Sequence, residues 1–269
     1  MKTKEKYELY KPKKFLGQNF LVDDNVARKI TKQLENEPSD KIIEIGPGQG
    51  ALTKHLIEYG DNFTAVEIDS SICKKLKKIY GEKLNLVNMD FLKYEITSEE
   101  NQKIRIIGNI PYNITSEILF KLFDNKNKIQ TAVLMIQKEV AERLVANFNT
   151  KEYGILAIQT QVNCLPEILF NVNKKSFFPK PLVNSAIVRL NFGLNQYSIE
   201  DYEIFRRVVR DSFGMRRKIM RNSLSKFIAE LNLKYKDIDF DFQNRPESLR
   251  VLEFVQLANM IYDAHRNKK

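Results

Sequence analysis

The sequence predicts an α/β protein in which a mostly parallel sheet of about seven strands is followed by a small all-helical domain. Through the first half of the chain, short apolar runs alternate with longer amphipathic ones, the pattern of strands joined by crossover helices. Beyond about residue 192 the strand pattern stops and only helical patterns remain. We therefore expect two domains, residues 1–192 and residues 193–269.

Seven segments fit strands because each is a short, largely apolar run. The first five are residues 41–45, 63–68, 84–89, 104–107 and 131–136. The last two are residues 166–172 and 185–190, which follow a helix expected at residues 153–162. Strands that alternate with helices in this way build βαβ crossovers, so most of them should lie parallel in one sheet.

Helical periodicity fills the gaps between the strands, as at residues 51–59 and 116–123. The second of these helices follows Thr115, whose side chain suits a helix N-cap. A link that contains glycine and asparagine, residues 191–195, ends the strand region. Beyond it, helical patterns cover residues 199–213, 218–231 and 249–265, with a turn-like stretch at residues 237–246.

Composition narrows the class of protein. The 269 residues include 44 Lys or Arg and 34 Asp or Glu, a formal net charge of +10 that favours a polyanionic partner such as RNA or DNA. The charged N-terminus and the absence of an apolar run near ~20 residues lead us to expect a cytoplasmic protein. We expect no metal site, because Cys73, Cys164, His55 and His265 lack metal-ligand spacing. A monomer is expected, since no long apolar seam is evident.

Four positions at strand ends recur at the spacing of one βα unit. They are Gly46, Glu67, Asp90 and Asn109, which lie 21, 23 and 19 residues apart. Each closes an apolar run, and the carboxyl ends of parallel strands line one edge of an open sheet. All four should therefore converge on the crevice where such folds bind ligands.

The first three of these positions suit an adenosine-containing cofactor. Gly46 and Gly48 allow a tight turn and a close approach of the backbone to a ligand. Glu67 is placed to accept hydrogen bonds from two ribose hydroxyls, and Asp90 could accept one from an adenine amino group. These residues define the class of cofactor but not its identity.

A nicotinamide dinucleotide is one alternative, because Gly46, Gly48 and Ala51 satisfy the relaxed G-x-G-x-x-G/A pattern. Hydride transfer also needs a group for the accompanying proton, and no histidine or lysine is evident near these motifs. The fourth strand end, moreover, carries a clamp for a base that a dehydrogenase does not need. S-Adenosyl-L-methionine therefore fits better as the cofactor.

That clamp is the tetrad Asn109-Ile110-Pro111-Tyr112. The side-chain oxygen of Asn109 and the backbone carbonyl of Ile110 could accept the two N–H groups of an adenine amino nitrogen, which localises its lone pair toward a methyl group. Tyr112 would stack on the base, and an aromatic of the Phe177-Phe178-Pro179 segment could close the other face. Catalysis would then depend on positioning and electrostatics, without a dedicated strong base.

Two basic clusters suit phosphate contacts that position an RNA rather than read its sequence. One precedes residue 15 and contains Lys11, Lys13 and Lys14. The other falls within 16 residues and contains Arg206, Arg207, Arg210, Arg216, Arg217, Lys218 and Arg221. A solvated helical face is the structural alternative for the second cluster.

Over almost its whole length, the chain resembles the KsgA-type ribosomal RNA adenine N6-dimethyltransferases. The matching segments are residues 14–21, 44–53, 65–69, 108–113, 137–144, 177–190, 216–218 and 257–259. The resemblance implies a Rossmann-like class I methyltransferase sheet and the transfer of four methyl groups from S-adenosyl-L-methionine. The acceptors would be two adjacent adenines in the 3′-terminal stem-loop of small-subunit (16S) rRNA, within an assembling small subunit.

The same resemblance implies roles for individual residues. The cofactor contacts would be Asn19, Leu21, Gly46, Glu67, Asp90 and Asn109. The residues that hold the target adenine would be Asn109, Ile110, Tyr112 and Phe178, so that Asn109 serves both ligands. The helical domain would dock on the ribosome.

One segment departs from the pattern of this family. Lys180 and Asn184 stand where a proline and an aspartate are expected, and they resemble the related Erm enzymes that methylate large-subunit rRNA. An Erm-like acceptor is therefore the second hypothesis. The third hypothesis is a ribosome-assembly or nucleic-acid-binding factor that has kept a methyltransferase fold but has lost its activity. It ranks last because Glu67, Asp90 and the clamp are all present.

Overall fold

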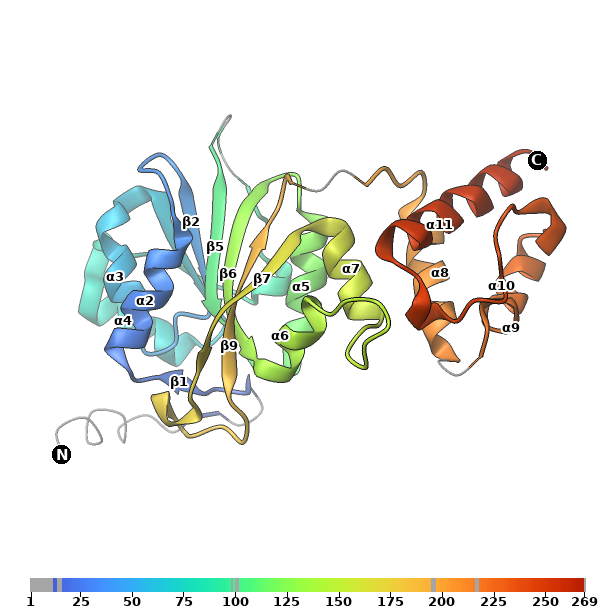
Figure 1. The fold of residues 1–269 in the computed structure, drawn as a ribbon. Coiled ribbons are helices and arrows are strands. Elements are labelled where there is room, and N and C mark those ends of the chain that lie inside the picture. The colour runs from blue at the N-terminus through green and yellow to red at the C-terminus, as the bar shows by residue number, and fades with distance from the viewer. Residues whose placement is uncertain are drawn as a thin grey trace. The chain divides into compact units, whose positions relative to one another are not determined.

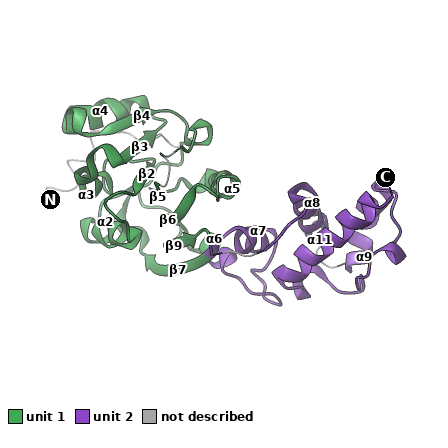
Figure 2. Cartoon of the chain, turned by 90° about the horizontal axis from the view of Figure 1, so that it is seen from above, with its two compact units in different colours: residues 1–141, 166–193 green, residues 142–165, 194–269 purple. Residues whose placement is uncertain are grey.

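The structure is a computed structural model that describes residues 12–13, 16–97, 99, 102–194, 197–215 and 218–268. By the contacts among its residues the chain forms two compact units, coloured separately in Figure 2. Unit 1 comprises residues 1–141 and 166–193, and unit 2 comprises residues 142–165 and 194–269. The segment 142–165 thus groups with the C-terminal helices, whereas the predicted first domain included it. The functional division at residue 192 stays a prediction.

Unit 1 is built on a seven-stranded sheet in the order β4-β3-β2-β5-β6-β9-β7 (Figure 1). Its strands are β2 (Lys41–Ile45), β3 (Phe63–Glu67), β4 (Asn85–Asn88), β5 (Ile104–Asn109), β6 (Ile129–Gln137), β7 (Leu165–Val172) and β9 (Ser185–Asn191). The pairs β2–β3, β3–β4, β2–β5 and β5–β6 are parallel, and β9 runs antiparallel to β6. The predicted fold class, with a mostly parallel sheet of seven strands, is confirmed.

Helices cover both faces of this sheet, because its central strands are apolar on both sides. The helices of the sheet region are α2 (Asp24–Thr31), α3 (Thr53–Leu56), α4 (Ser70–Tyr80), α5 (Thr115–Asp124) and α6 (Lys138–Leu144). Figure 2 shows α2 and α3 on one face and α5 on the other. Alternate strand residues divide between the faces: Ile42 and Phe63 pack with Ile30 of α2 and Leu76 of α4 in one buried cluster.

Three local predictions differ from the structure. The helix expected at residues 51–59 is α-helical only from Thr53 to Leu56, after which a 3-10 segment (Ile57–Asn62) passes through Gly60 at φ 54°. Thr115 is the first residue of α5 and not its N-cap. Its hydroxyl donates a hydrogen bond to the Pro111 carbonyl at 3.3 Å and so does not cap the helix. The sequence analysis also missed a two-stranded antiparallel pair formed by β1 (Phe20–Leu21) and β8 (Phe177–Phe178).

Unit 2 is helical, which confirms the predicted helical C-terminal region. It contains α7 (Ile155–Asn163), α8 (Tyr202–Gly214), α9 (Met220–Ser223), α10 (Ser225–Glu230) and α11 (Val251–Arg266). Fully buried Phe205 and Phe254 join Ile158 and Leu257 in one apolar core. The single helix expected at residues 218–231 is divided into α9 and α10 at Leu224.

Two features are absent from the described residues. None of their helices combines the length and the apolar character that crossing a bilayer requires. Among the same residues, no group of His, Cys, Asp and Glu side chains is arranged to hold a metal ion.

Candidate functional site

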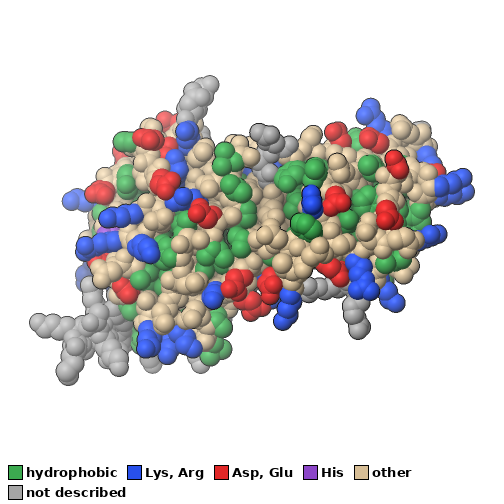
Figure 3. All heavy atoms as spheres, in the orientation of Figure 1, with side chains coloured by type: hydrophobic (Ala, Val, Ile, Leu, Met, Phe, Trp, Pro, Cys, Tyr) green, Lys and Arg blue, Asp and Glu red, His purple; other side chains and the backbone are tan. Residues whose placement is uncertain are grey.

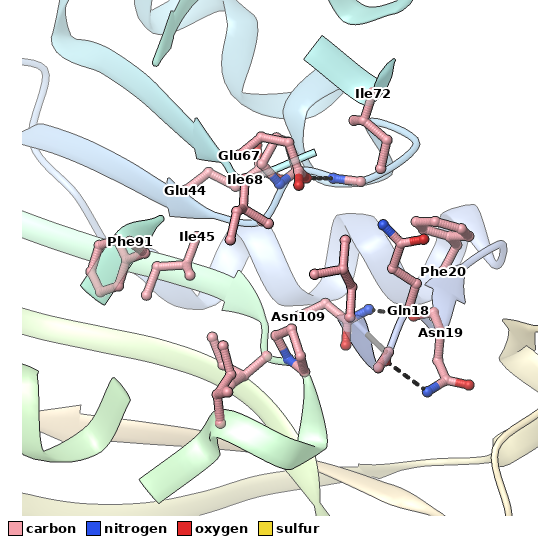
Figure 4. A pocket seen from close by; sticks show the side chains of 18 of the residues that line it. Gln18, Asn19, Phe20, Glu44, Ile45, Glu67, Ile68, Ile72, Phe91 and Asn109 are labelled. Atoms are coloured by element: carbon pink, nitrogen blue, oxygen red, sulfur yellow. Dashed lines mark hydrogen bonds between the residues drawn. The ribbon is translucent and has the colours of Figure 1, made fainter. Parts of the chain in front are cut away.

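A pocket of about 290 Å³ opens at the carboxyl ends of β2, β3 and β5 in unit 1 (Figure 4). It is lined mainly by residues 16–21, 44–49, 66–68, 90–92 and 109–114. All four strand-end positions predicted from their spacing, Gly46, Glu67, Asp90 and Asn109, are among the lining residues. The topology brings them together because parallel strands end at the same edge of a sheet.

The glycine turn after β2 leaves room for a ligand at one glycine and contacts protein at another. Gly46 and Gly48 have φ values of 63° and 53°, a conformation that side chains with a Cβ rarely adopt. A Cβ added to Gly46 would meet nothing within 4 Å, whereas one added to Gly48 would lie 2.9 Å from Cδ1 of Phe20. The turn therefore exposes bare backbone to the pocket at Gly46.

Glu67 ends β3 with its side chain buried beside the glycine turn (Figure 4). One carboxylate oxygen accepts a hydrogen bond from the Gly48 amide at 3.2 Å, and the other accepts from the Asp69 amide at 2.9 Å. Burial raises the pKa of Glu67, and these two backbone bonds oppose the shift. A carboxylate can accept about four hydrogen bonds, so further acceptor capacity remains for a ligand.

Glu44 is a second buried carboxyl of this site, and the sequence analysis gave it no role. Its side chain is 1% exposed and accepts a hydrogen bond from the Thr53 hydroxyl at 2.7 Å. Burial raises the pKa of Glu44 to about 8, and the nearby Glu67 charge adds to the effect. A carboxyl with this pKa is largely protonated at pH 7. The signal was present in the sequence, since Glu44 is the one acidic residue within an otherwise apolar strand end.

Asp90 and the residues after it form the third side of the pocket. Asp90 caps a short 3-10 turn (Phe91–Lys93), and its carboxylate accepts from the Leu92 amide at 2.9 Å. The side chain is half-buried, and Phe91 and Leu92 line the pocket next to it. Because the cap uses one acceptor position of the carboxylate, others stay available to a ligand.

The tetrad after β5 lies at the same pocket. The Asn109 side-chain nitrogen donates to the Asn19 carbonyl at 2.8 Å, an arrangement that leaves the amide oxygen as an acceptor. Ile110 is buried, and its backbone nitrogen donates to the Met135 carbonyl at 3.0 Å. Tyr112 shares a hydrogen bond of 2.8 Å with the hydroxyl of Ser185 in β9, and burial raises the pKa of the phenol. The sequence analysis did not anticipate the contact with Ser185.

Phe178 takes a different position from the other three residues of the predicted clamp. Asn109, Ile110 and Tyr112 line the pocket, but Phe178 does not belong to the lining within the described part of the chain. In the β1–β8 ladder Phe178 lies opposite Phe20, which does line the pocket. The structure thus places Phe178 beside a lining residue and outside the lining itself.

A short N-terminal segment, residues 16–21, contributes six lining residues, including the predicted Asn19 and Leu21. It is held by Asp69, whose side chain is 0% exposed: Gln18 donates to this carboxylate at 3.1 Å, and Lys13 forms an ion pair with it at 2.8 Å. Asp69 also caps α4. The sequence analysis missed this anchor, because residues more than fifty positions apart form it.

The basic clusters are only partly described. Lys11, Lys14, Arg216 and Arg217 lie outside the described residues. Of the arginines in α8, each contacts a carboxylate: the pairs are Arg206 with Glu203, Arg207 with Asp211 and Glu230, and Arg210 with Asp211. Figure 3 likewise shows acidic side chains interspersed among basic ones on the visible face. Neighbouring carboxylates therefore offset part of the charge that the sequence suggested for this helix.

The sheet order, the glycine turn and the carboxylates at successive strand ends define a Rossmann-like class I methyltransferase, and the Asn-Ile-Pro-Tyr tetrad suits an amino group on a base as its acceptor. More particularly, the chain belongs to the ribosomal RNA adenine dimethylase family, whose model matches residues 10–263. The resemblance inferred from the motifs is thereby confirmed. The protein is an S-adenosylmethionine-dependent rRNA adenine dimethyltransferase.

Individual relatives agree with this assignment. The chain is 41% identical over 261 residues to ribosomal RNA small subunit methyltransferase A of Francisella tularensis subsp. novicida, a match that covers 93% of this chain and 98% of that protein. A crystal structure of a dimethyladenosine transferase from Plasmodium falciparum has a TM-score of 0.73 at 25% identity, covering 90% and 97% of the two chains. The 23S rRNA methyltransferase ErmE has a TM-score of 0.66 at 25% identity, covering 91% and 100%.

Proposed function

We propose that this enzyme dimethylates N6 of two adjacent adenines in the 3′-terminal stem-loop of small-subunit (16S) rRNA, acting as a monomer on the assembling subunit in the cytoplasm. The observation that carries the choice of acceptor is the 41% identity, over nearly the whole of both chains, to a small-subunit methyltransferase. The likeness to ErmE is at 25% identity. Large-subunit rRNA is accordingly the second candidate acceptor.

The residues of the pocket fit S-adenosyl-L-methionine. Gly46 leaves open space where a side chain would otherwise stand. Glu67 would accept hydrogen bonds from the ribose hydroxyls, and Asp90 would accept one from the adenine amino group. Asn19, Leu21, Gly48 and Asn109 would complete the contacts. When bound, this cofactor supplies an electrophilic methyl group.

The far end of the pocket would hold the target adenine. The Asn109 side-chain oxygen and the Ile110 carbonyl would accept the two N–H groups of N6, so that its lone pair points at the methyl group. Tyr112 would stack on the base, with its ring orientation fixed by the hydrogen bond to Ser185. Phe178 would contribute from beside Phe20, outside the lining, and we assign it a smaller share of base binding than Tyr112.

The departures at residues 180 and 184 do not favour the second candidate. The side-chain oxygen of Asn184 accepts a hydrogen bond from the Lys174 amide at 3.1 Å, and an aspartate could accept the same bond. Lys180 is exposed and lies in the loop between β8 and β9. A conservative exchange and an exposed side chain give no reason to change the acceptor.

For unit 2 we propose docking on the ribosome through phosphate contacts, which salt should weaken.

The test is mass spectrometry of rRNA after the purified protein is incubated with S-adenosylmethionine and unmethylated small subunits, with protein-free large-subunit rRNA in parallel. Dimethyladenosine in the small-subunit rRNA alone is the expected result. Product only in the large-subunit RNA would overturn the proposed acceptor and establish the Erm-like alternative. If neither RNA is modified while the protein binds the cofactor, the proposal fails in favour of a binding role.

A further inference from the structure

The loop between β8 and β9, residues 179–184, presents an unusually exposed leucine. Leu182 is 92% exposed, more than any other large hydrophobic side chain in the described residues, and Val183 beside it is 43% exposed. A single exposed leucine is ordinary on a protein surface and carries no argument by itself. Leu182 differs from other exposed leucines in how its loop is held, in the residues that flank the loop and in the charge of the segment.

Hydrogen bonds hold the loop at Leu182 and at Asn184, two residues further on. The Asn184 carbonyl accepts from the Lys138 amide at 3.0 Å, and the Asn184 side chain accepts from the Lys174 amide at 3.1 Å. The Lys174 ammonium donates to the Leu182 carbonyl itself at 3.2 Å. Pro181, directly before the leucine, is buried. The backbone is thus tied in a conformation that directs an apolar side chain into water, which gains nothing for the protein alone.

The two residues that flank the loop each contact a residue of the pocket lining. It begins directly after Phe178, which pairs with Phe20 of the pocket lining. It is followed by Ser185, the first residue of β9, whose hydroxyl is hydrogen-bonded to Tyr112. In Figure 1 it lies at the edge of unit 1 that also carries β1. An RNA strand whose base enters the pocket at Tyr112 would therefore pass near Ser185, the residue that follows this loop.

The chain segment that carries the leucine is basic. Residues 173–184 include Lys174, Lys175 and Lys180 and no acidic residue. The lysines favour a nucleic acid as the partner of this loop. They can contact its phosphates while the side chain of Leu182 contacts its bases. An apolar protein partner would gain nothing from these three charges.

We propose that Leu182 is a wedge that enters the rRNA beside the target adenine and takes the place the base leaves in the stack. An adenine in a stem-loop must be extruded before it can reach a pocket such as this one. Apolar side chains, leucine among them, are inserted between base steps by proteins that unstack nucleic acids. This inference rests on the proposed function, since it requires a structured RNA whose adenine turns into the pocket at Tyr112.

The test compares Leu182→Ala with Ile79→Ala, a matched control in α4 whose native side chain is 57% exposed. A stem-loop RNA carries 2-aminopurine next to the target adenine, and S-adenosylhomocysteine replaces the methyl donor so that no turnover occurs. Binding of wild-type and Ile79→Ala enzyme should raise the fluorescence severalfold, because the neighbouring base loses its stacking partner. Leu182→Ala should abolish most of this rise, and Leu182→Met should retain it.

A second readout separates unstacking from binding. With small subunits as substrate, Leu182→Ala should lower kcat/KM about tenfold, a modest part of the cost of unstacking a base. With a single-stranded oligonucleotide of the same sequence, whose adenine needs no extrusion, kcat/KM should stay unchanged. If Leu182→Ala lowers kcat/KM equally on both substrates, the wedge is overturned. It is also overturned if kcat/KM falls on neither substrate and the fluorescence rise is unchanged.

Other outcomes distinguish this inference from the proposed function. If wild-type enzyme leaves small subunits unmodified but gives a fluorescence rise that depends on Leu182, the proposed acceptor fails and the wedge is supported. If Leu182→Ala loses activity only on subunits and keeps the fluorescence rise on the naked stem-loop, the loop contacts a ribosomal protein and the wedge is overturned.

Discussion

The two ends of the pocket are built in different ways. At the proposed cofactor end, backbone amides of the glycine turn and of Asp69 bind the buried Glu67 carboxylate, and burial raises the pKa of the nearby Glu44 to about 8. At the proposed base end, the side-chain oxygen of Asn109 is an acceptor that its own donor bond leaves available, and Tyr112 is oriented from a distant strand by Ser185. One end is organised by backbone amides around a buried carboxylate, and the other by single hydrogen bonds that orient side chains.

This difference has a physical reason. The two backbone amides that bind Glu67 are satisfied within the protein, so the cofactor end needs little rearrangement. A base must enter from an RNA and leave again. This favours acceptors and ring faces that are held in position but are not already bonded within the protein. Substitutions at the two ends should therefore affect RNA methylation and cofactor binding separately.

Replacing Tyr112 should damage the base end alone. Tyr112→Ala should lower kcat/KM for small subunits about a hundredfold, the upper range for loss of one stacked base with its positioning. The affinity for S-adenosylhomocysteine, measured by calorimetry, should stay within twofold. Tyr112→Phe keeps the ring but loses the bond to Ser185, so its activity should fall only a fewfold. A Tyr112→Ala enzyme with wild-type turnover would remove Tyr112 from the site.

Replacing Glu67 should damage the cofactor end first. Glu67→Gln cannot accept from both the Gly48 and Asp69 amides and also from a ribose, because one oxygen becomes an amide donor. We expect S-adenosylhomocysteine to bind about thirtyfold more weakly, as for loss of a hydrogen bond to a charged group. At saturating cofactor the turnover number should recover most of its value. Asp90→Asn should show a smaller loss of affinity, and an affinity unchanged in both variants would contradict the assignment.

The two glycines of the turn test whether space or strain matters at the cofactor end. Both residues have positive φ, so alanine at either position should cost about 1–2 kcal/mol of stability. Gly48→Ala adds a close contact with Phe20 and should be the less stable variant by thermal unfolding. Gly46→Ala meets no protein atom, so its further effect should be about tenfold weaker cofactor binding. Equal cofactor affinity in the two variants would show that the open space at Gly46 does not hold the ligand.

The contrast between the two ends also describes what could be predicted from the sequence. Buried strands need apolar runs and parallel strands share an edge, so Gly46, Glu67, Asp90 and Asn109 could be brought to one pocket from their spacing alone. The partnership of Tyr112 with Ser185 could not be found, because 73 residues separate the pair.

Other misses have the same origin. The β1 and β8 strands are two residues long and carry no periodicity, so their pairing was invisible. Thr115 was wrongly given the cap of α5 because local propensity ignores the turn that precedes it: Pro111 supplies the carbonyl that its hydroxyl binds. The carboxylates that offset the arginines of α8 include Glu230 of α10, which the sequence alone does not place beside them.

The last and smallest effect on methyl transfer concerns Glu44, and it is a dependence on pH. A carboxyl whose pKa rises from 4.5 to about 8 on folding binds more protons in the folded state between these values. Its contribution to stability is therefore present below about pH 4.5 and is lost progressively as the pH rises toward about 8. Glu44→Gln keeps an acceptor for Thr53 and cannot ionise, so this loss should vanish.

At pH 7 the wild-type carboxyl is already largely protonated, and turnover by Glu44→Gln should stay within about threefold of wild type. The measurement is Tm against pH from 5 to 9 for both proteins. The two should melt together at pH 5, and the variant should melt several degrees higher at pH 9. Tyr112→Phe, a change at the base end, should follow the wild-type curve. If the difference in Tm between Glu44→Gln and wild type does not change with pH, the ionisation of Glu44 does not cause the pH dependence of stability.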